Sequence, residues 1–262
     1  MNDTFDPFCT DLLVGPLVWA TFSVPAACVG VPASMWLLWA LIQRQRSRSS
    51  NTVYMLNLTI MDLGFNLLII PNVLNYLIWR DAIFNSVAVF SYAFNLCGRP
   101  LFMSCICVDC YMAVIHPITY MQMKDGIYRI IICALVWVFT LVYGYLLGLK
   151  TYVILVILAF TAPVIAYCDL SILHTLRKPD PSRRSDIHPQ KQRALQTITN
   201  SLVMTLVSYL PLMILIAVQS LIVLSPTEFI CHVAIPCVIA ATVGSTIMPL
   251  LNLWQMGCTR KE

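Results

Sequence analysis

Long apolar stretches with few or no charges occupy most of this chain. A helix needs about 20 apolar residues to cross a bilayer core that is roughly 30 Å thick. Seven stretches of the 262-residue chain reach that length, and Lys150 separates the fourth from the fifth. The sequence therefore predicts an all-α membrane protein, a single seven-transmembrane helix bundle, with spans at residues 12–43, 52–79, 82–115, 126–149, 151–176, 194–224 and 229–257.

The composition also indicates a protein that is embedded in lipid. Hydrophobic residues make up 59% of the chain and charged residues 11%, and the mean hydropathy is +0.80. Because a soluble domain carries about 25% charged residues, a water-soluble enzyme, a disordered regulator and a nucleic-acid binder are disfavoured. The eleven cysteines include one Cys-x-x-Cys pair, Cys107 and Cys110, with no second pair to complete a zinc site. We therefore expect no enzyme, no metal site and no cofactor.

The basic residues predict how the chain is oriented. Thirteen of the sixteen Lys and Arg residues follow odd-numbered spans, whereas only Arg80 and Lys150 follow even-numbered ones. Since cytosolic loops carry the excess of Lys and Arg, we expect a multi-pass plasma-membrane protein with an extracellular N-terminus at residues 1–11. Residues 177–193 would form the third cytosolic loop and residues 258–262 a short cytosolic tail.

Two modification sites are candidates on this topology. Asn2 opens an Asn-Asp-Thr sequon on the outer side, which makes it a candidate for N-glycosylation. Cys258 follows the last span, where a juxtamembrane cysteine can carry a palmitoyl chain or remain a free thiol.

Two short motifs lie in the second and third predicted spans. Residues 56–63 read Leu-Asn-Leu-Thr-Ile-Met-Asp-Leu, and residues 109–117 read Asp-Cys-Tyr-Met-Ala-Val-Ile-His-Pro. They resemble the Leu-Asn-Leu-Ala-x-x-Asp-Leu and Asp-Arg-Tyr-x-Ala-Val-x-x-Pro signatures of rhodopsin-like (class A) G protein-coupled receptors. Counterparts of that family's landmark residues follow in the right order at Trp137, Pro163, Tyr209, Pro211 and Pro249. Among its branches, the peptide, nucleotide and chemokine receptors are the nearest.

The resemblance implies a receptor that binds an unknown extracellular ligand and signals to a heterotrimeric G protein by rearranging its helices. The positions that would face the G protein or form the switch are Asp109, Cys110, Tyr111, Pro117, Ile118, Met248, Pro249 and Asn252. Cys110 stands where the family has Arg, and Asn252 where it has Tyr. We therefore expect weakened G protein coupling, with a non-signalling decoy or scavenger binding protein as the alternative.

Two ionisable residues, Asp62 and Arg99, lie well inside predicted spans. A charge at that depth is costly unless it is paired or solvated. In the family this Asp faces the third span and often binds sodium. Here the facing position is Arg99, so we expect its guanidinium to bind Asp62 in a bidentate ion pair and to replace the ion. A static salt bridge that only joins helices and a functional lock remain equally open.

The resemblance also suggests where a ligand would bind and which cysteines would pair. The candidate ligand cavity is formed by Asn72, Tyr76, Tyr92, Tyr209 and Thr242, although core packing explains each tyrosine equally well. Related receptors join the N-terminal segment to the start of the last span by a disulfide, which would link Cys9 to Cys231 here.

Overall fold

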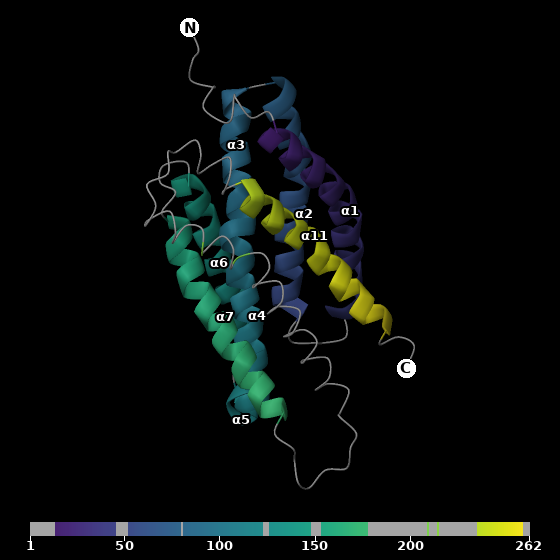
Figure 1. Cartoon of the computed structure of the whole chain (residues 1–262). Helices are drawn as coiled ribbons and strands as arrows, with labels where there is room; N and C mark the ends of the chain where they lie inside the picture. Colours follow the sequence, from purple (N-terminus) through teal and green to yellow (C-terminus); the bar gives the residue numbers. More distant parts are fainter. Residues whose placement is uncertain are drawn as a thin grey trace.

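The part of the chain that the structure describes is almost entirely helical. The computed structural model describes residues 14–45, 52–79, 81–122, 126–147, 153–177, 209, 214 and 235–258. Its α-helices are α1 (Val14–Gln45), α2 (Thr52–Leu74), α3 (Ala82–Ala93), α4 (Arg99–Ile115), α5 (Pro117–Gln122), α6 (Gly126–Leu147), α7 (Val153–Arg177) and α11 (Ile235–Cys258) (Figure 1). Two π-helical turns, η1 (Asn75–Trp79) and η2 (Phe94–Gly98), extend α2 and join α3 to α4.

Among the described residues, five helical segments are long and apolar enough to cross a membrane. They are Leu17–Gln43, Val53–Trp79, Ser86–Ile115, Ile127–Leu146 and Val156–Thr175. A shorter apolar helix covers Val238–Trp254. The predicted span at residues 194–224 lies outside the described residues except for Tyr209 and Ile214. The expected all-helical, multi-pass membrane character is therefore confirmed for the described residues.

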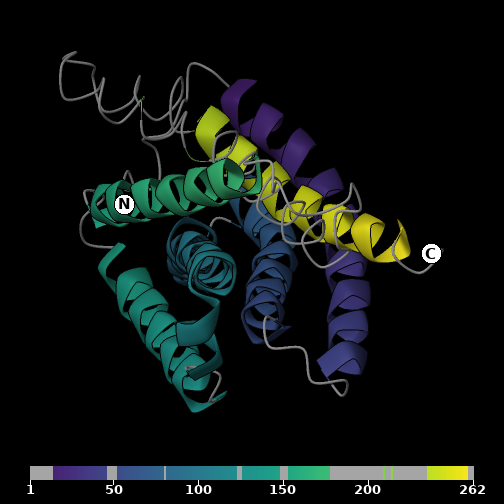
Figure 2. The same ribbon diagram turned by 90° about the horizontal axis from the view of Figure 1, so that it is seen from below.

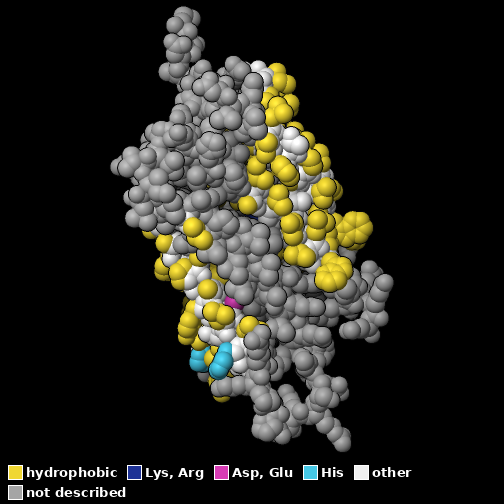
Figure 3. Space-filling model, viewed as in Figure 1, with side chains coloured by type: hydrophobic (Ala, Val, Ile, Leu, Met, Phe, Trp, Pro, Cys, Tyr) yellow, Lys and Arg dark blue, Asp and Glu magenta, His cyan; other side chains and the backbone are white. Residues whose placement is uncertain are grey.

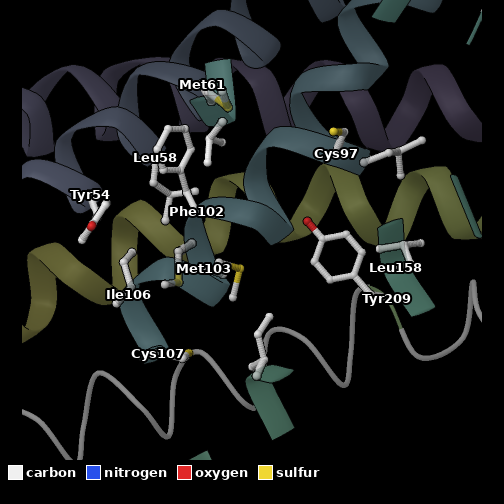
Figure 4. Close-up of a cluster of buried hydrophobic side chains, with 14 of the residues drawn as sticks. Tyr54, Leu58, Met61, Cys97, Phe102, Met103, Ile106, Cys107, Leu158 and Tyr209 are labelled. Carbon is white, nitrogen blue, oxygen red and sulfur yellow. The ribbon is translucent and has the colours of Figure 1, made fainter. Parts of the chain in front are cut away.

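The rod formed by α3, η2 and α4 lies in the middle of the described helices, and α2, α6 and α7 pack around it. Helix α1 packs along α2 and α11, as the two views of the ribbon show (Figures 1 and 2). The interior between these helices is filled with apolar side chains (Figure 4). Those labelled there are Tyr54, Leu58, Met61, Cys97, Phe102, Met103, Ile106, Cys107, Leu158 and Tyr209.

The outward faces of the helices are also apolar. Trp36 on α1, Phe139 on α6 and Phe160 on α7 are 66%, 64% and 69% exposed. Hydrophobic side chains cover much of the described surface in the space-filling view (Figure 3). Large aromatic side chains on the outside of a bundle are stable when the surrounding solvent is hydrocarbon, which fits a chain embedded in lipid.

The π-helical turn η2 sets the direction of the residues that follow it. Pro100 has no N–H and its ring crowds the carbonyl four residues earlier, which disfavours a regular α-helical turn at this point. The backbone N–H of Arg99 instead bonds the carbonyl of Phe94, five residues back. The wider turn rotates α4 relative to α3. Gly98 completes this turn where a Cβ atom would overlap the side chain of Met61 on α2, so α2 and the rod approach closely.

Candidate functional site

Arg99 is buried at the centre of the bundle, with 1% of its surface exposed. Its Nη2 donates to the carbonyl oxygen of Gly244 at 2.7 Å, and its Nη1 donates to that of Ala241 at 3.5 Å. Both carbonyls belong to α11, so one guanidinium joins the start of α4 to the middle of the last helix. The charge is thereby hydrogen-bonded mainly to backbone dipoles, which lower the cost of burying it.

Asp62 of α2 faces the other edge of the same guanidinium. Arg99 Nε lies 3.6 Å from Asp62 Oδ1, and the two side chains are 1% and 4% exposed. Among the described residues this Nε–H makes no hydrogen bond, so the pair is held by charge attraction alone. The expected bidentate contact is therefore wrong, because both terminal nitrogens of Arg99 are used by the carbonyls of α11.

A layer of polar groups extends from this ion pair between the helices. Ser245 Oγ donates to Asn66 Oδ1 at 3.2 Å, which connects α11 to α2. Asn95 Nδ2 donates to the carbonyl of Ala241 at 3.1 Å, and the hydroxyl of Tyr209 donates to the carbonyl of Asn95 at 3.0 Å. The layer therefore connects α2, η2, α11 and the residue at 209 in the middle of the bundle.

Asn66 and Asn95 were not predicted to belong to the site. Both are buried, at 0% and 2% exposure. Each lies four residues from an ion-pair member, Asn66 after Asp62 and Asn95 before Arg99. Residues four apart share one face of a helix, so this spacing was the signal that could have found Asn66. The π-turn shifts Asn95 relative to Arg99, yet both still face α11.

The described residues of the predicted ligand cavity make hydrogen bonds or ring contacts inside the bundle. Asn72 Nδ2 donates to Ser91 Oγ at 3.0 Å, and Thr242 Oγ1 donates to the carbonyl of Val238 at 2.8 Å. Tyr92 packs its ring 5.8 Å from that of Phe65. The side chain of Tyr76 lies outside the described part. Tyr209 belongs to the polar layer above, so these residues have separate contacts and a shared ligand cavity stays a prediction.

An open groove of about 380 Å³ lies elsewhere, on the outer surface between α4, α6 and α7. Its lining is entirely apolar, and none of the five predicted cavity residues contributes to it. The lining residues are Leu101, Ile132, Leu135, Val136, Phe139, Val156, Ile157 and Phe160.

A second cluster of charged and polar side chains lies at the far end of α4. Arg129 of α6 donates from Nη2 and Nε to Asp109 Oδ1, at 2.9 and 3.3 Å. Tyr120 of α5 donates its hydroxyl hydrogen to Asp109 Oδ2 at 3.3 Å and accepts a hydrogen bond from Arg129 Nη2 at 3.0 Å. Sequence reasoning did not identify Arg129 or Tyr120, because Arg129 counts only as a loop-flanking cation in the charge pattern.

The other switch positions lie at the same end of the bundle or along α11. Cys110, at the arginine position of the motif, is buried at 5% exposure, and Tyr111 packs its ring 6.0 Å from that of Tyr167 on α7. Ile118 is 77% exposed, and Pro117 beside it is also exposed. Along α11 the switch positions, all buried, are Met248, Pro249 and Asn252.

The landmark tryptophan connects two helices. Trp137 Nε1 of α6 donates to Asn57 Oδ1 of α2 at 2.9 Å. The amide nitrogen of Asn57 in turn donates to the carbonyl of Val53 at 2.9 Å. The two motif residues therefore support each other in the packing of α2 against α6.

Several predicted sites fall outside the described part of the chain. They are the sequon at Asn2, the proposed disulfide between Cys9 and Cys231, and the side chain of Cys258. Within the described residues no group of three or more His, Cys, Asp or Glu side chains is arranged to hold a metal ion.

Comparison with known proteins finds a family that is similar to the segment holding most of these side chains. Residues 34–151, which contain Asp62, Arg99, Asp109 and Arg129, match the 7 transmembrane receptor (rhodopsin family). This segment of the chain is therefore related to rhodopsin-like receptors, and the resemblance inferred from the motifs is confirmed.

Individual relatives agree with this class. The chain is 32% identical over 114 residues to a purinoceptor of Xenopus laevis, and the match covers 42% of the chain and 21% of the receptor. It is 32% identical over 120 residues to human proteinase-activated receptor 3, covering 44% of the chain and 32% of that receptor. G-protein coupled receptor 183 of Rattus norvegicus is 30% identical over 115 residues, covering 42% and 32%. The matches span only about a fifth to a third of each relative, and these relatives are receptors, not enzymes.

Proposed function

We propose that the chain is a rhodopsin-like receptor in the plasma membrane with weakened G protein coupling. It would form a seven-helix bundle, with residues 194–224 as the sixth span and the N-terminus outside. An extracellular ligand would bind this bundle and shift the equilibrium between two helix arrangements. The receptors named above support the kind of partner expected, a ligand outside and a G protein inside.

One observation carries the weakened coupling. In receptors of this family, the arginine after the motif aspartate pairs with that aspartate in the inactive state and contacts the G protein in the active state. Here that position is Cys110, whose thiol is at best a weak donor and carries no positive charge. Asp109 is instead bound by Arg129, which lies on a different helix, at 2.9 Å. Asp109 is therefore paired with an arginine of another helix, and the chain lacks the motif guanidinium that would leave the aspartate for a G protein.

The ion pair in the middle of the bundle supports a stable inactive arrangement. Arg99 holds the carbonyls of Ala241 and Gly244, so any movement of α11 away from α4 must break these hydrogen bonds in a low-dielectric interior. A ligand can shift the equilibrium only by its differential affinity for the two arrangements. A binding protein that never signals, a decoy or scavenger, is the second candidate that this tether favours.

A nucleotide-exchange assay tests the proposal. Membranes from cells that express the chain with heterotrimeric G proteins are assayed for basal GTPγS binding, normalised to the receptor at the cell surface. We expect exchange near background for the unmodified chain and a several-fold increase for Cys110→Arg, with a further increase when Asn252→Tyr is added. Val108→Arg is the matched control, because Val108 is 41% exposed on α4 and its replacement adds the same charge two residues away.

The outcomes separate the candidate functions. Strong exchange by the unmodified chain would contradict weakened coupling and restore an ordinary receptor. Background exchange by all surface-expressed variants, Cys110→Arg with Asn252→Tyr included, would replace the proposal with the decoy. Equal increases for Val108→Arg and Cys110→Arg would show that position 110 has no special role.

A further inference from the structure

The short helix α5 presents two apolar side chains at the end of the bundle that is predicted to be cytosolic. It begins at Pro117 directly after His116, where the backbone leaves the helical conformation with φ −124° and ψ 62°. Ile118 and Met121 on this helix are 77% and 73% exposed. The direction of α5 relative to α4 therefore decides where these two side chains point.

Six residues are too few for a helix to be stable in isolation, because the free energy lost in ordering the first turn exceeds what its few hydrogen bonds provide. At the junction, the backbone N–H of Tyr120 donates to the carbonyl of His116 at 2.9 Å. This bond closes the first turn of α5 and does not fix the direction of the helix. Side-chain contacts must therefore supply most of what holds α5 in place.

One guanidinium supplies several of these contacts. Arg129 binds Asp109 Oδ1 through two nitrogens and donates to the hydroxyl of Tyr120 at 3.0 Å. Its Cζ also lies 5.4 Å from the centre of the Tyr120 ring, within the range of a cation–π interaction. Arg129 thus joins the end of α4, the helix α5 and the start of α6. Its side chain is 7% exposed and that of Asp109 is 12% exposed, so these bonds are largely shielded from water.

We propose that Arg129 is a positioning residue that fixes α5, acting through Asp109 and Tyr120, and so sets the direction of Ile118 and Met121. The proposal rests on the receptor function above, in which Ile118 faces the G protein, and it names the group that orients this surface. A guanidinium on α6 would then take over one role of the missing motif arginine, which is to bind Asp109. It holds the aspartate but stays on the fourth span, so it orders the docking loop without contacting the partner itself.

Hydrogen–deuterium exchange of the full chain in lipid nanodiscs tests the positioning directly and needs neither ligand nor G protein. In Arg129→Gln we expect the backbone amides of residues 118–122, the part of α5 after Pro117, to exchange about tenfold faster than in the unmodified chain. Tyr120→Phe removes only the hydroxyl, so it should cause a smaller increase in the same segment. Arg129→Lys retains the positive charge without the planar fork, and it should restore part of the protection.

The matched control is Tyr128→Phe, which removes a hydroxyl from the neighbouring residue of α6. Tyr128 is 60% exposed, and its variant should leave residues 118–122 unchanged. A faster exchange confined to residues 118–122 and reduced in Arg129→Lys supports the proposal. Unchanged exchange in Tyr120→Phe and Arg129→Gln would overturn it, as would an equal increase throughout α4 and α6. If Arg129→Gln fails to fold, Tyr120→Phe decides on the same criterion.

A second arm connects the position of α5 with signalling. In the Cys110→Arg background, adding Arg129→Gln should lower GTPγS binding several-fold at equal surface expression. If Cys110→Arg activates no G protein, even with Asn252→Tyr added, the receptor proposal fails while the hydrogen–deuterium exchange measurement still decides whether Arg129 positions α5. If Cys110→Arg activates and Arg129→Gln changes neither activation nor exchange, the positioning role is wrong and the receptor proposal stands.

Discussion

Two aspartate–arginine pairs lie at different depths in this chain and bind different kinds of partner. Asp62 and Arg99 lie in the middle of the bundle, 3.6 Å apart, and the terminal nitrogens of the arginine bind backbone carbonyls. Asp109 and Arg129 lie at one end, 2.9 Å apart, and both bind the hydroxyl of Tyr120. The first pair ties a helix backbone to the core, whereas the second orders a loop helix through side chains.

The difference in geometry follows from what each arginine can reach. Arg99 faces α11, whose carbonyls at Ala241 and Gly244 accept its hydrogen bonds in addition to their helical ones. Arg129 lies near the start of a helix where two side-chain acceptors, Asp109 and Tyr120, are close. An arginine bound to backbone is insensitive to most side-chain replacements in its partner helix, whereas an arginine bound to side chains depends on each partner.

The largest expected effect is the loss of Arg99. Arg99→Leu leaves Asp62 as an unpaired charge and removes the tether to α11, so we expect a destabilisation of about 3–5 kcal/mol and a strong loss of surface expression. Asp62→Asn should cost less than Arg99→Leu, because Arg99 keeps its two carbonyl acceptors. The double variant should be less damaged than the sum of the single losses. Thermal unfolding in detergent and surface staining measure all three variants.

Additive losses in this cycle would show that the 3.6 Å contact contributes nothing. A cost for Asp62→Asn equal to that for Arg99→Leu would show that the carbonyl contacts of Arg99 do not matter. Either result would remove the distinction between a backbone tether and a simple salt bridge.

A smaller loss of stability is expected at the second pair. Asp109 is 12% exposed and Asp62 only 4%, so Arg129→Gln leaves a carboxylate that water can reach more easily. We expect a cost of about 1–2 kcal/mol, which includes the charged hydrogen bonds to Asp109. High salt should weaken the pair at the bundle end and leave the central pair unaffected, so thermal unfolding at about 0.1 M and about 1 M potassium chloride compares the two variants. An equal cost for Arg129→Gln and Arg99→Leu would contradict the ranking by burial.

The central pair was predictable from the sequence, and the pair at the end was not. Asp62 and Arg99 stand out because each is a lone charge in a long apolar stretch. Arg129 lies at the edge of such a stretch, where a cation is ordinary, and only the approach of α6 to α4 brings it to Asp109. That approach depends on the packing of two helices, which no local pattern specifies.

The backbone partners of Arg99 were beyond sequence reasoning for a different reason. Every helix residue has a carbonyl, so nothing in the residue types at 241 and 244 distinguishes them as acceptors. Their selection depends on the π-helical turn at Phe94–Gly98, which precedes Arg99 and sets its direction. Pro100 disfavours a regular α-helical turn, but a proline alone does not determine whether a helix kinks or widens. The apolar spans themselves, in contrast, follow from length and composition, which one bilayer thickness constrains.

The smallest expected effect is that of sodium on stability, where we expect no difference between sodium and a cation that cannot bind. In receptors that this chain resembles, the aspartate of the second span often binds the ion. Here the guanidinium of Arg99 lies 3.6 Å from Asp62, and its like charge opposes a second cation. We expect the thermal unfolding temperature in sodium chloride to equal that in choline chloride at the same ionic strength.

Asp62→Asn serves as the matched control for sodium, since it removes the carboxylate beside Arg99 and must also show no sodium effect. A ligand that binds only the folded state raises stability by its own binding free energy. A sodium-specific increase in the unmodified chain that disappears in Asp62→Asn would therefore show a functional ion site. It would mean that Arg99 tethers α11 through the carbonyls of Ala241 and Gly244 without replacing the ion at Asp62.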